Sequence, residues 1–209
     1  MRFSKIISIL LHPIFMPTIA VYLSVKLIPE VEINIKKSLS GIYLVLFFST
    51  IILPLISILV LIKRKAVSSL EMKNYKERPL PLFISFIWMS IGYYTLEEIL
   101  TPVLRVEILC AIIITFVASI ISKYWKISIH MLGLGGVIGI VIGLNILFGG
   151  LIPQIMGSIV CAGALSWARI REKAHNYTQV YVGFLVGFLI QISGLLLFYN
   201  YIYNFNLSL

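Results

Sequence analysis

The chain has 209 residues, of which 60% are hydrophobic and only 12% are charged, and its mean hydropathy is +1.03. A soluble domain needs roughly 25% charged residues to cover its surface, so this composition argues against a soluble enzyme, a disordered segment and a nucleic-acid-binding module. The net charge of +9 is therefore interpreted first as membrane topology and then as attraction for an anionic, phosphorylated lipid.

Apolar runs long enough to cross a bilayer follow one another along the chain. The first, 6–27, follows two basic residues as a signal peptide would. It contains Pro13 and Pro17 and no small-residue cleavage pattern, so we expect an uncleaved, kinked span. Further spans are predicted at 41–62, 80–96, 103–122, 131–149, 151–168 and 178–203.

The sequence thus predicts an all-α polytopic helix bundle of six to seven spans, forming a single transmembrane domain over residues 1–209. The third and sixth runs are short, and Gly149, Gly150 and Pro153 make a tight hinge before the sixth. Six spans with one broken or re-entrant segment is therefore the alternative to seven.

Seven spans would place the N-terminus and the polar stretches 63–79, 123–130 and 169–177 on one side, called the basic face below. Thirteen of the 17 basic residues then lie on that face. The other face receives most of the acidic residues, which are Glu30, Glu32, Glu97, Glu98 and Glu107. The positive-inside rule predicts a cytoplasmic basic face, in what we expect to be the inner (plasma) membrane of a bacterium.

Three segments of the basic face carry side chains that can bind or transfer phosphate. They are residues 73–79 (KNYKERP), 126–130 (KISIH) and 169–179 (RIREKAHNYTQ). Each precedes an apolar run and is therefore predicted at the N-terminal end of a helix, where free amide N–H groups and the helix dipole favour an anion. Because two spans separate successive segments, all three should meet on one side of the membrane.

This arrangement resembles the type-2 phosphatidic acid phosphatase (lipid phosphate phosphatase) superfamily, whose motifs read Lys-x6-Arg-Pro, Pro-Ser-Gly-His and Ser-Arg-x5-His-x3-Asp. The matching residues here are Arg78-Pro79, then Ser128-x-His130, then Arg169-x5-His175-x3-Gln179. The resemblance covers about residues 70–200, and the first two spans carry none of it. Five motif positions differ from the pattern: Glu71, Ile127, Ile129, Ala168 and Gln179.

The resemblance implies that His175 attacks phosphorus to form a phosphohistidine, while His130 protonates the leaving oxygen and later activates water. It implies that phosphate oxygens are bound by Arg78, Ser128 and Arg169, with Lys73 or Lys76 in place of the missing motif lysine. Gln179 lies four residues after His175 and can orient its imidazole, but without the charge of the usual Asp. We therefore expect a weaker nucleophile, which Gln179→Asp should strengthen.

The implied activity is hydrolysis of a phosphorylated lipid such as phosphatidate, phosphatidylglycerol phosphate, a polyprenyl diphosphate or a lipid A phosphate. No metal or other cofactor is expected, since the basic face has neither an acidic cluster for Mg²⁺ nor a zinc ligand set. The altered motifs keep a second interpretation open, a non-catalytic lipid-binding or interaction protein on the same fold. Bacterial members of the superfamily are expected to face the periplasm, which conflicts with the charge distribution.

Other polar and small residues have simpler interpretations. His12 is expected to be structural or interfacial, Glu97 and Glu98 to be solvated, and both cysteines to be packing residues. Small-residue steps at Gly135, Gly139 and Gly143, and at Gly183 and Gly187, predict close helix packing and a surface for a homo-oligomer. Prolines in the first two spans would also suit a transporter, but no internal repeat supports that rival.

Overall fold

A computed structural model describes residues 3–72 and 74–207, with side chains described as far as residue 197. Within these ranges the chain is helical and has no strand. The elements are α1 (Phe3–Leu10), the 3-10 turn η1 (Pro13–Phe15), α2 (Met16–Leu27), α3 (Pro29–Ile35), α4 (Leu39–Phe47), the π-helical turn η2 (Phe48–Ile52), α5 (Leu53–Lys63), the 3-10 turn η3 (Tyr75–Glu77), α6 (Pro79–Leu96), α7 (Pro102–Tyr124), α8 (Ile129–Phe148), α9 (Ile152–Arg171) and α10 (Tyr177–Leu207).

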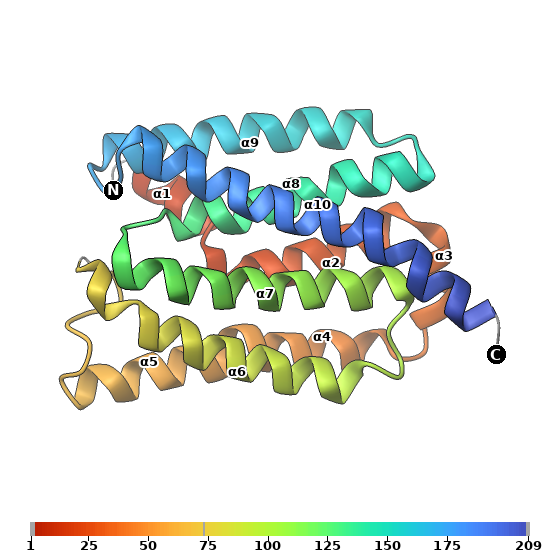
Figure 1. Cartoon of the computed structure of the whole chain (residues 1–209), viewed down its shortest axis with the longest axis horizontal. Coiled ribbons are helices and arrows are strands. Elements are labelled where there is room, and N and C mark those ends of the chain that lie inside the picture. The colour runs from red at the N-terminus through yellow and green to blue at the C-terminus, as the bar shows by residue number, and fades with distance from the viewer. Residues whose placement is uncertain (1–2, 73, 208–209) are drawn as a thin grey trace.

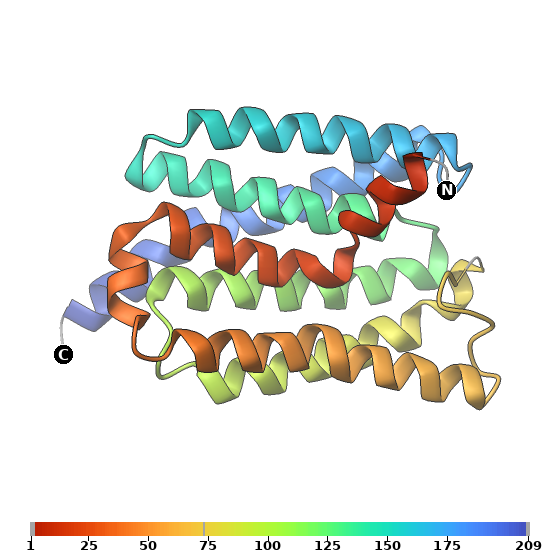
Figure 2. The same cartoon turned by 180° about the vertical axis from the view of Figure 1, so that it is seen from behind.

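The chain runs back and forth along the bundle in alternating directions (Figures 1 and 2). Among the described residues, six of these passages are helices long and apolar enough to cross a membrane: Phe3–Leu27, Leu39–Lys63, Tyr75–Leu96, Pro102–Tyr124, Ile129–Phe148 and Tyr177–Leu197. The protein is therefore an all-α, polytopic integral membrane helix bundle, as predicted. The seventh passage, α9, carries more polar residues but lies beside α8 as one unbroken helix of 20 residues.

Prolines shape the first two passages as expected. The first divides into α1, η1 and α2, with Pro13 and Pro17 each at the start of the helix it enters. In the second passage the π-helical turn η2 ends just before Pro54. A proline ring has no N–H and clashes with the carbonyl four residues earlier, and widening the preceding turn relieves that clash.

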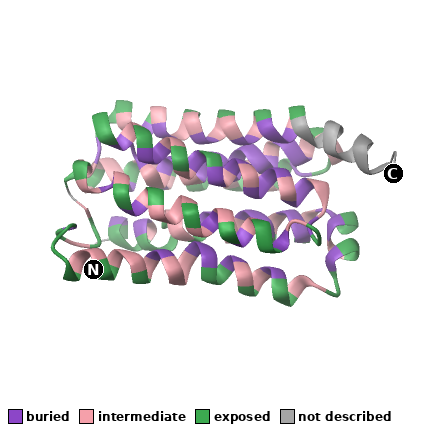
Figure 3. Cartoon of the chain, turned by 60° about the horizontal axis from the view of Figure 1, so that its bottom comes forward, coloured by how far each residue is buried: buried purple, intermediate pink, exposed green. Residues whose placement is uncertain are grey.

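The core is centred on α8, whose residues are buried along most of its length (Figure 3). The predicted glycine ridges face each other there. A Cβ added at Gly135 would meet the Phe184 carbonyl oxygen, and one added at Gly187 would meet the Leu132 carbonyl oxygen. The glycines thus permit backbone contact between α8 and α10 inside one chain, while self-association stays a prediction.

Two placements differ from expectation. Arg169 lies in the last turn of α9, not at the N-terminal end of a helix, because α9 continues to Arg171 before the chain turns. A cation is favoured at that position since the C-terminal end of a helix dipole is negative. Glu107 belongs to the acidic residues counted on the far face, but its side chain is only 1% exposed, because it lies inside the first turns of α7 and faces α2.

Candidate functional site

The three motif segments lie at one end of the bundle, on the left in Figure 1. The loop before α6, the link between α7 and α8, and the turn between α9 and α10 all reach this end, together with the N-terminal helix α1. The alternating direction of the passages produces this convergence, as the spacing of the motifs predicted. The segments assigned to the basic face therefore lie together at one end of the helix bundle.

His175 is held in one orientation by the start of α10. Its side chain is buried, and its Nδ1 lies 3.0 Å from Oε1 of Gln179. The same Oε1 accepts the Asn176 backbone N–H at 3.3 Å, while Oδ1 of Asn176 accepts the Gln179 backbone N–H at 2.9 Å. This is a reciprocal capping box, which explains locally why an Asn and a Gln stand three residues apart.

The capping box also fixes the tautomer of His175. Since Oε1 of Gln179 accepts a backbone N–H, it is the oxygen of the amide and an acceptor for the imidazole as well. Nδ1 of His175 must then carry the hydrogen, which leaves a lone pair on Nε2. An imidazole with a free Nε2 lone pair and an anchored Nδ1–H is arranged as a nucleophile or base.

The surroundings of His175 keep its ring neutral. The pKa of His175 is lowered to about 4, mainly by burial; the hydrogen bond to Gln179 acts in the opposite direction, and the positive charges of Arg169, Arg78 and Lys126 add to the lowering. The imidazole is therefore uncharged at neutral pH. Because these cations come from all three motif segments, the electrostatic coupling shows that the fold brings the segments together around His175.

Arg78 joins the first motif segment to the second. It stands at the mouth of α6, just before Pro79, and is buried. Its Nε donates to the Met72 carbonyl at 3.1 Å and its Nη1 to the Ile127 carbonyl at 3.3 Å. The guanidinium thus holds the loop before α6 and the link between α7 and α8 by their backbone carbonyls, and its other N–H groups remain available to an anion.

Ser128 joins the second segment to the third. Its backbone N–H donates to the Gln179 carbonyl at 3.2 Å, and its side chain is fully buried. A Cβ at Gly183 would lie 2.7 Å from the Ser128 carbonyl oxygen, so this glycine allows α10 to approach closely. The Ser128 hydroxyl has no hydrogen-bond partner among the described residues, which leaves a buried donor unsatisfied.

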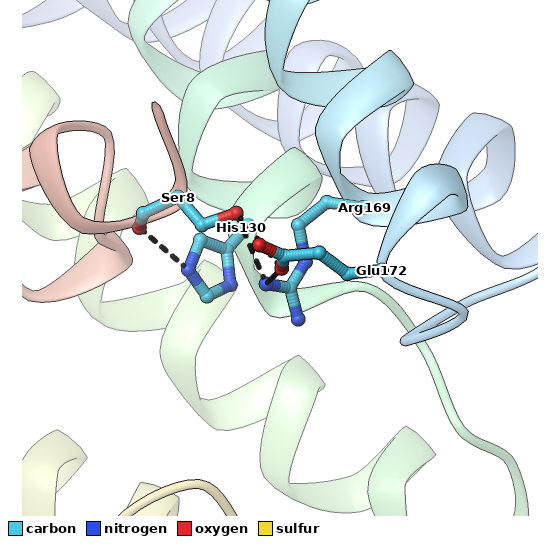
Figure 4. A network of polar contacts seen from close by, with 4 residues as sticks. All are labelled: Ser8, His130, Arg169 and Glu172. Atoms are coloured by element: carbon cyan, nitrogen blue, oxygen red, sulfur yellow. Dashed lines mark hydrogen bonds and ion pairs between the residues drawn. The ribbon is translucent and has the colours of Figure 1, made fainter. Parts of the chain in front are cut away.

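Arg169 is bound by residues that sequence reasoning did not select (Figure 4). Its Nη1 donates to Oε2 of Glu172 and to Oγ of Ser8, both at 3.3 Å. The Arg169 Nε is buried and has no partner within the part of the chain that the structure describes. The first span therefore contributes to the cluster, although it carries no motif residue.

His130 also contacts the first span. Its Nε2 lies 3.2 Å from the Ser8 carbonyl oxygen (Figure 4). A carbonyl only accepts, so this Nε2 carries the hydrogen and Nδ1 is the nitrogen free to exchange a proton.

The His12 ring packs edge-on against His130, with centroids 5.1 Å apart, and its Nδ1 accepts the Ile14 N–H. His12 thus has the structural contact expected, but beside the candidate site. In the sequence, the feature that could have indicated a role for Ser8 and His12 is that both are polar residues within an otherwise apolar run.

The candidate lysines are placed unequally. Lys126 is half-buried, and burial, followed by the charges of Arg78 and Arg169, lowers its pKa. Lys76 is exposed, and its side chain makes no hydrogen bond or ion pair within the described ranges. Lys73 lies outside the described residues. Lys126, rather than Lys76, is therefore the lysine that interacts electrostatically with Arg78 and Arg169.

No family model matches this chain, and neither the curated proteins nor the solved structures include a significant match. Among residues 3–72 and 74–197, no group of three His, Cys, Asp or Glu side chains has the geometry of a metal site. What the geometry offers is an anion site: two guanidinium groups, a lysine, a buried hydroxyl and two imidazoles with defined free nitrogens.

Proposed function

We propose that this protein is a membrane phosphatase that hydrolyses a phosphorylated lipid through a phosphohistidine at His175. The observation that carries the proposal is the state of His175, a buried neutral imidazole whose Nδ1–H is held by Gln179, with its Nε2 lone pair free. The cations that surround it come from separate motif segments. Two buried donors that lack partners among the described residues, Ser128 Oγ and Arg169 Nε, supply positions for phosphate oxygens.

The residues support a two-step displacement. Nε2 of His175 attacks phosphorus, and the bond from phosphorus to the lipid oxygen breaks. The leaving oxygen takes a proton from Nδ1 of His130, which becomes charged when a negative phosphate offsets the nearby arginines. Water then attacks the phosphohistidine, His130 accepts the water proton, and the P–N bond breaks. Arg78 and Arg169 stabilise the charge that develops on the non-bridging oxygens.

The placement of the cluster favours an amphipathic substrate. It lies at the end of an apolar bundle whose outer helices expose large apolar side chains, so a lipid headgroup can reach it while the acyl chains remain in the bilayer. Phosphatidate, phosphatidylglycerol phosphate, a polyprenyl diphosphate and a lipid A phosphate all meet this description. The membrane we propose is the bacterial inner membrane, with the basic face cytoplasmic. A topology reporter inserted within residues 64–72 tests that orientation, and reporter activity on the outer side would overturn it.

A second candidate is a protein that binds the same lipid phosphates without hydrolysing them. Arg169 is already paired with Glu172, and Gln179 serves the capping box and brings no charge to His175. Both features fit a site that retains binding and has lost turnover.

Phosphate release distinguishes the two candidates. Purified protein in detergent is assayed with the four lipid classes, alongside His175→Ala and His130→Ala. Arg64→Ala, which removes an exposed arginine of the same face that is not among the cations acting on His175, is the matched control. Turnover in the wild type and in Arg64→Ala, with loss of at least about a hundredfold in both histidine variants, supports the phosphatase. Equal background release from all four proteins, with lipid binding retained, supports the non-catalytic protein.

A further inference from the structure

A carboxyl group lies deep in the apolar core, far from the basic cluster. Glu107 is 1% exposed, and its Oε2 accepts the Ser24 hydroxyl at 2.6 Å. Its second oxygen, Oε1, is buried and has no partner among the described residues. An ionisable side chain inside a membrane protein is expensive to bury, and such residues usually mark a binding site or a pathway.

Glu107 borders a partly open cavity of about 70 Å³. The lining includes Gln191, whose Nε2 donates to the Glu107 backbone carbonyl at 3.4 Å, and at the other end Ala118, Pro13 and Ile129. Glu107 and Ala118 are eleven residues apart on α7, so the cavity extends about 16 Å along the bundle. Pro13 and Ile129 are the chain neighbours of His12 and His130. The cavity thus leads from the carboxyl toward the basic face, and its volume accommodates several water molecules.

No cation of the described residues neutralises the Glu107 carboxylate. The charged residues of the helices packed against it are few: α2 carries only Lys26, which is exposed and paired with Glu32, α8 carries only His130 at its start, and α6 and α10 carry none. On α7 itself, Arg105 lies two residues before Glu107, and its Nε donates to the Leu100 carbonyl. The titratable groups that interact electrostatically with Glu107 are Tyr43 on α4 and Cys110 on α7. Neither brings a positive charge, so a carboxylate here would be uncompensated.

We propose that Glu107 is a proton-binding site inside the membrane, with its proton on Oε1 and exchanged with water through this cavity. The Ser24 hydroxyl donates to Oε2, which makes Oε2 the carbonyl oxygen and leaves Oε1 to carry the hydrogen. A bound sodium ion is less well served, because besides Glu107 only Thr115 and Gln191 bring a side-chain oxygen to the described lining of the cavity. These side-chain oxygens are too few for a sodium shell. This site does not depend on the proposed phosphatase activity.

Infrared difference spectroscopy on the full-length protein in lipid nanodiscs tests the proposal. The wild type at neutral pH should show the carbonyl stretch of a protonated carboxyl. Glu107→Gln should lose that band, while the control Glu98→Gln, at an exposed position, should keep it. Transfer to D₂O should shift the band, and Ala118→Leu, which fills the cavity toward the basic face, should slow that shift.

Ser24→Ala keeps the test decisive if Glu107→Gln does not fold. Loss of the hydroxyl donor should move the carbonyl band to higher frequency without abolishing it, because the carbonyl loses its hydrogen bond. A spectrum with no band assignable to Glu107 at neutral pH would overturn the proposal. Replacement of the band by a carboxylate band on addition of sodium chloride, but not choline chloride, would also overturn it in favour of a cation site.

Discussion

Replacing Gln179 by glutamate should activate His175 without moving it. Glutamate has the same length as glutamine, so its oxygen can still accept both the His175 Nδ1–H at 3.0 Å and the Asn176 N–H. The substitution adds a negative charge at that oxygen, and a carboxylate beside an imidazole stabilises the charged ring. The pKa of His175, about 4 in the wild type, should therefore rise.

The size of the rise follows from the contact that changes. A hydrogen bond to a charged partner stabilises by roughly 1.5–3 kcal/mol, and one pKa unit corresponds to about 1.4 kcal/mol. Gln179→Glu should thus raise the pKa of His175 by about one to two units and make Nε2 more nucleophilic. Gln179→Asp, the change that the motif suggests, is one methylene shorter and should have a smaller effect because it cannot reach both donors from the same backbone position.

Histidine-selective ¹⁵N NMR measures this directly, because the chain has only three histidines and His175→Ala assigns one of them. Gln179→Leu is the control that removes the acceptor and adds no charge; it should lower the pKa of His175. An unchanged titration of His175 in Gln179→Glu would refute the contact on which the site is built. Turnover should rise in parallel if charge at His175 limits the rate.

Three further changes follow from other contacts. Protonating buried His175 costs roughly 3 kcal/mol, because folding lowers its pKa from 6.5 to about 4. The stability of the wild type should therefore be complete above pH 6.5 and decline toward pH 4. His175→Phe should show a smaller decline in thermal unfolding, and equal declines in the two proteins would contradict this account. Gly187→Ala forces α8 and α10 apart and should destabilise by about 1–3 kcal/mol, whereas Gly163→Ala, in open space on α9, should stabilise slightly; similar melting temperatures would refute the packing. Glu172→Gln removes the carboxylate paired with Arg169; the Glu172 side chain is 18% exposed and the Arg169 side chain 13%. The freed guanidinium should lower KM for a phosphorylated lipid about fivefold. A higher KM would show instead that the ion pair positions Arg169 for binding.

Hydrophobic runs and prolines were sufficient to predict the fold. Span limits follow from the length of an apolar helix, and Pro13 and Pro54 mark the interruptions because a proline cannot complete the helical hydrogen bonds. The convergence of the three motif segments also followed, since an even number of spans between two segments returns them to the same side. α9 is harder to classify from the sequence, because its polar residues reduce its apolarity although it packs against α8 and α1.

Contacts between distant segments could not be predicted. Nothing in the sequence pairs Ser8 with Arg169 or His130, since 161 and 122 residues separate them and only the packing of α1 against α9 brings them together. Charge counting places Glu107 with the acidic residues of the far face, and for the same reason it cannot tell whether the side chain is solvated or buried. Burial of its side chain depends on the neighbouring helix, which supplies Ser24.

The most direct test of the proposed mechanism is to find the phosphoryl group on the enzyme. Protein mixed with a ³²P-labelled lipid phosphate is quenched in alkali within one turnover and digested, and the labelled peptide is sequenced. His130→Ala is included because it lacks the group that activates water, so that any intermediate it forms should break down slowly. The structure predicts an acid-labile, alkali-stable phosphate on Nε2 of His175, because Gln179 holds Nδ1. Label on Nδ1 or on another residue, or turnover with no trapped label in either protein, would contradict the account.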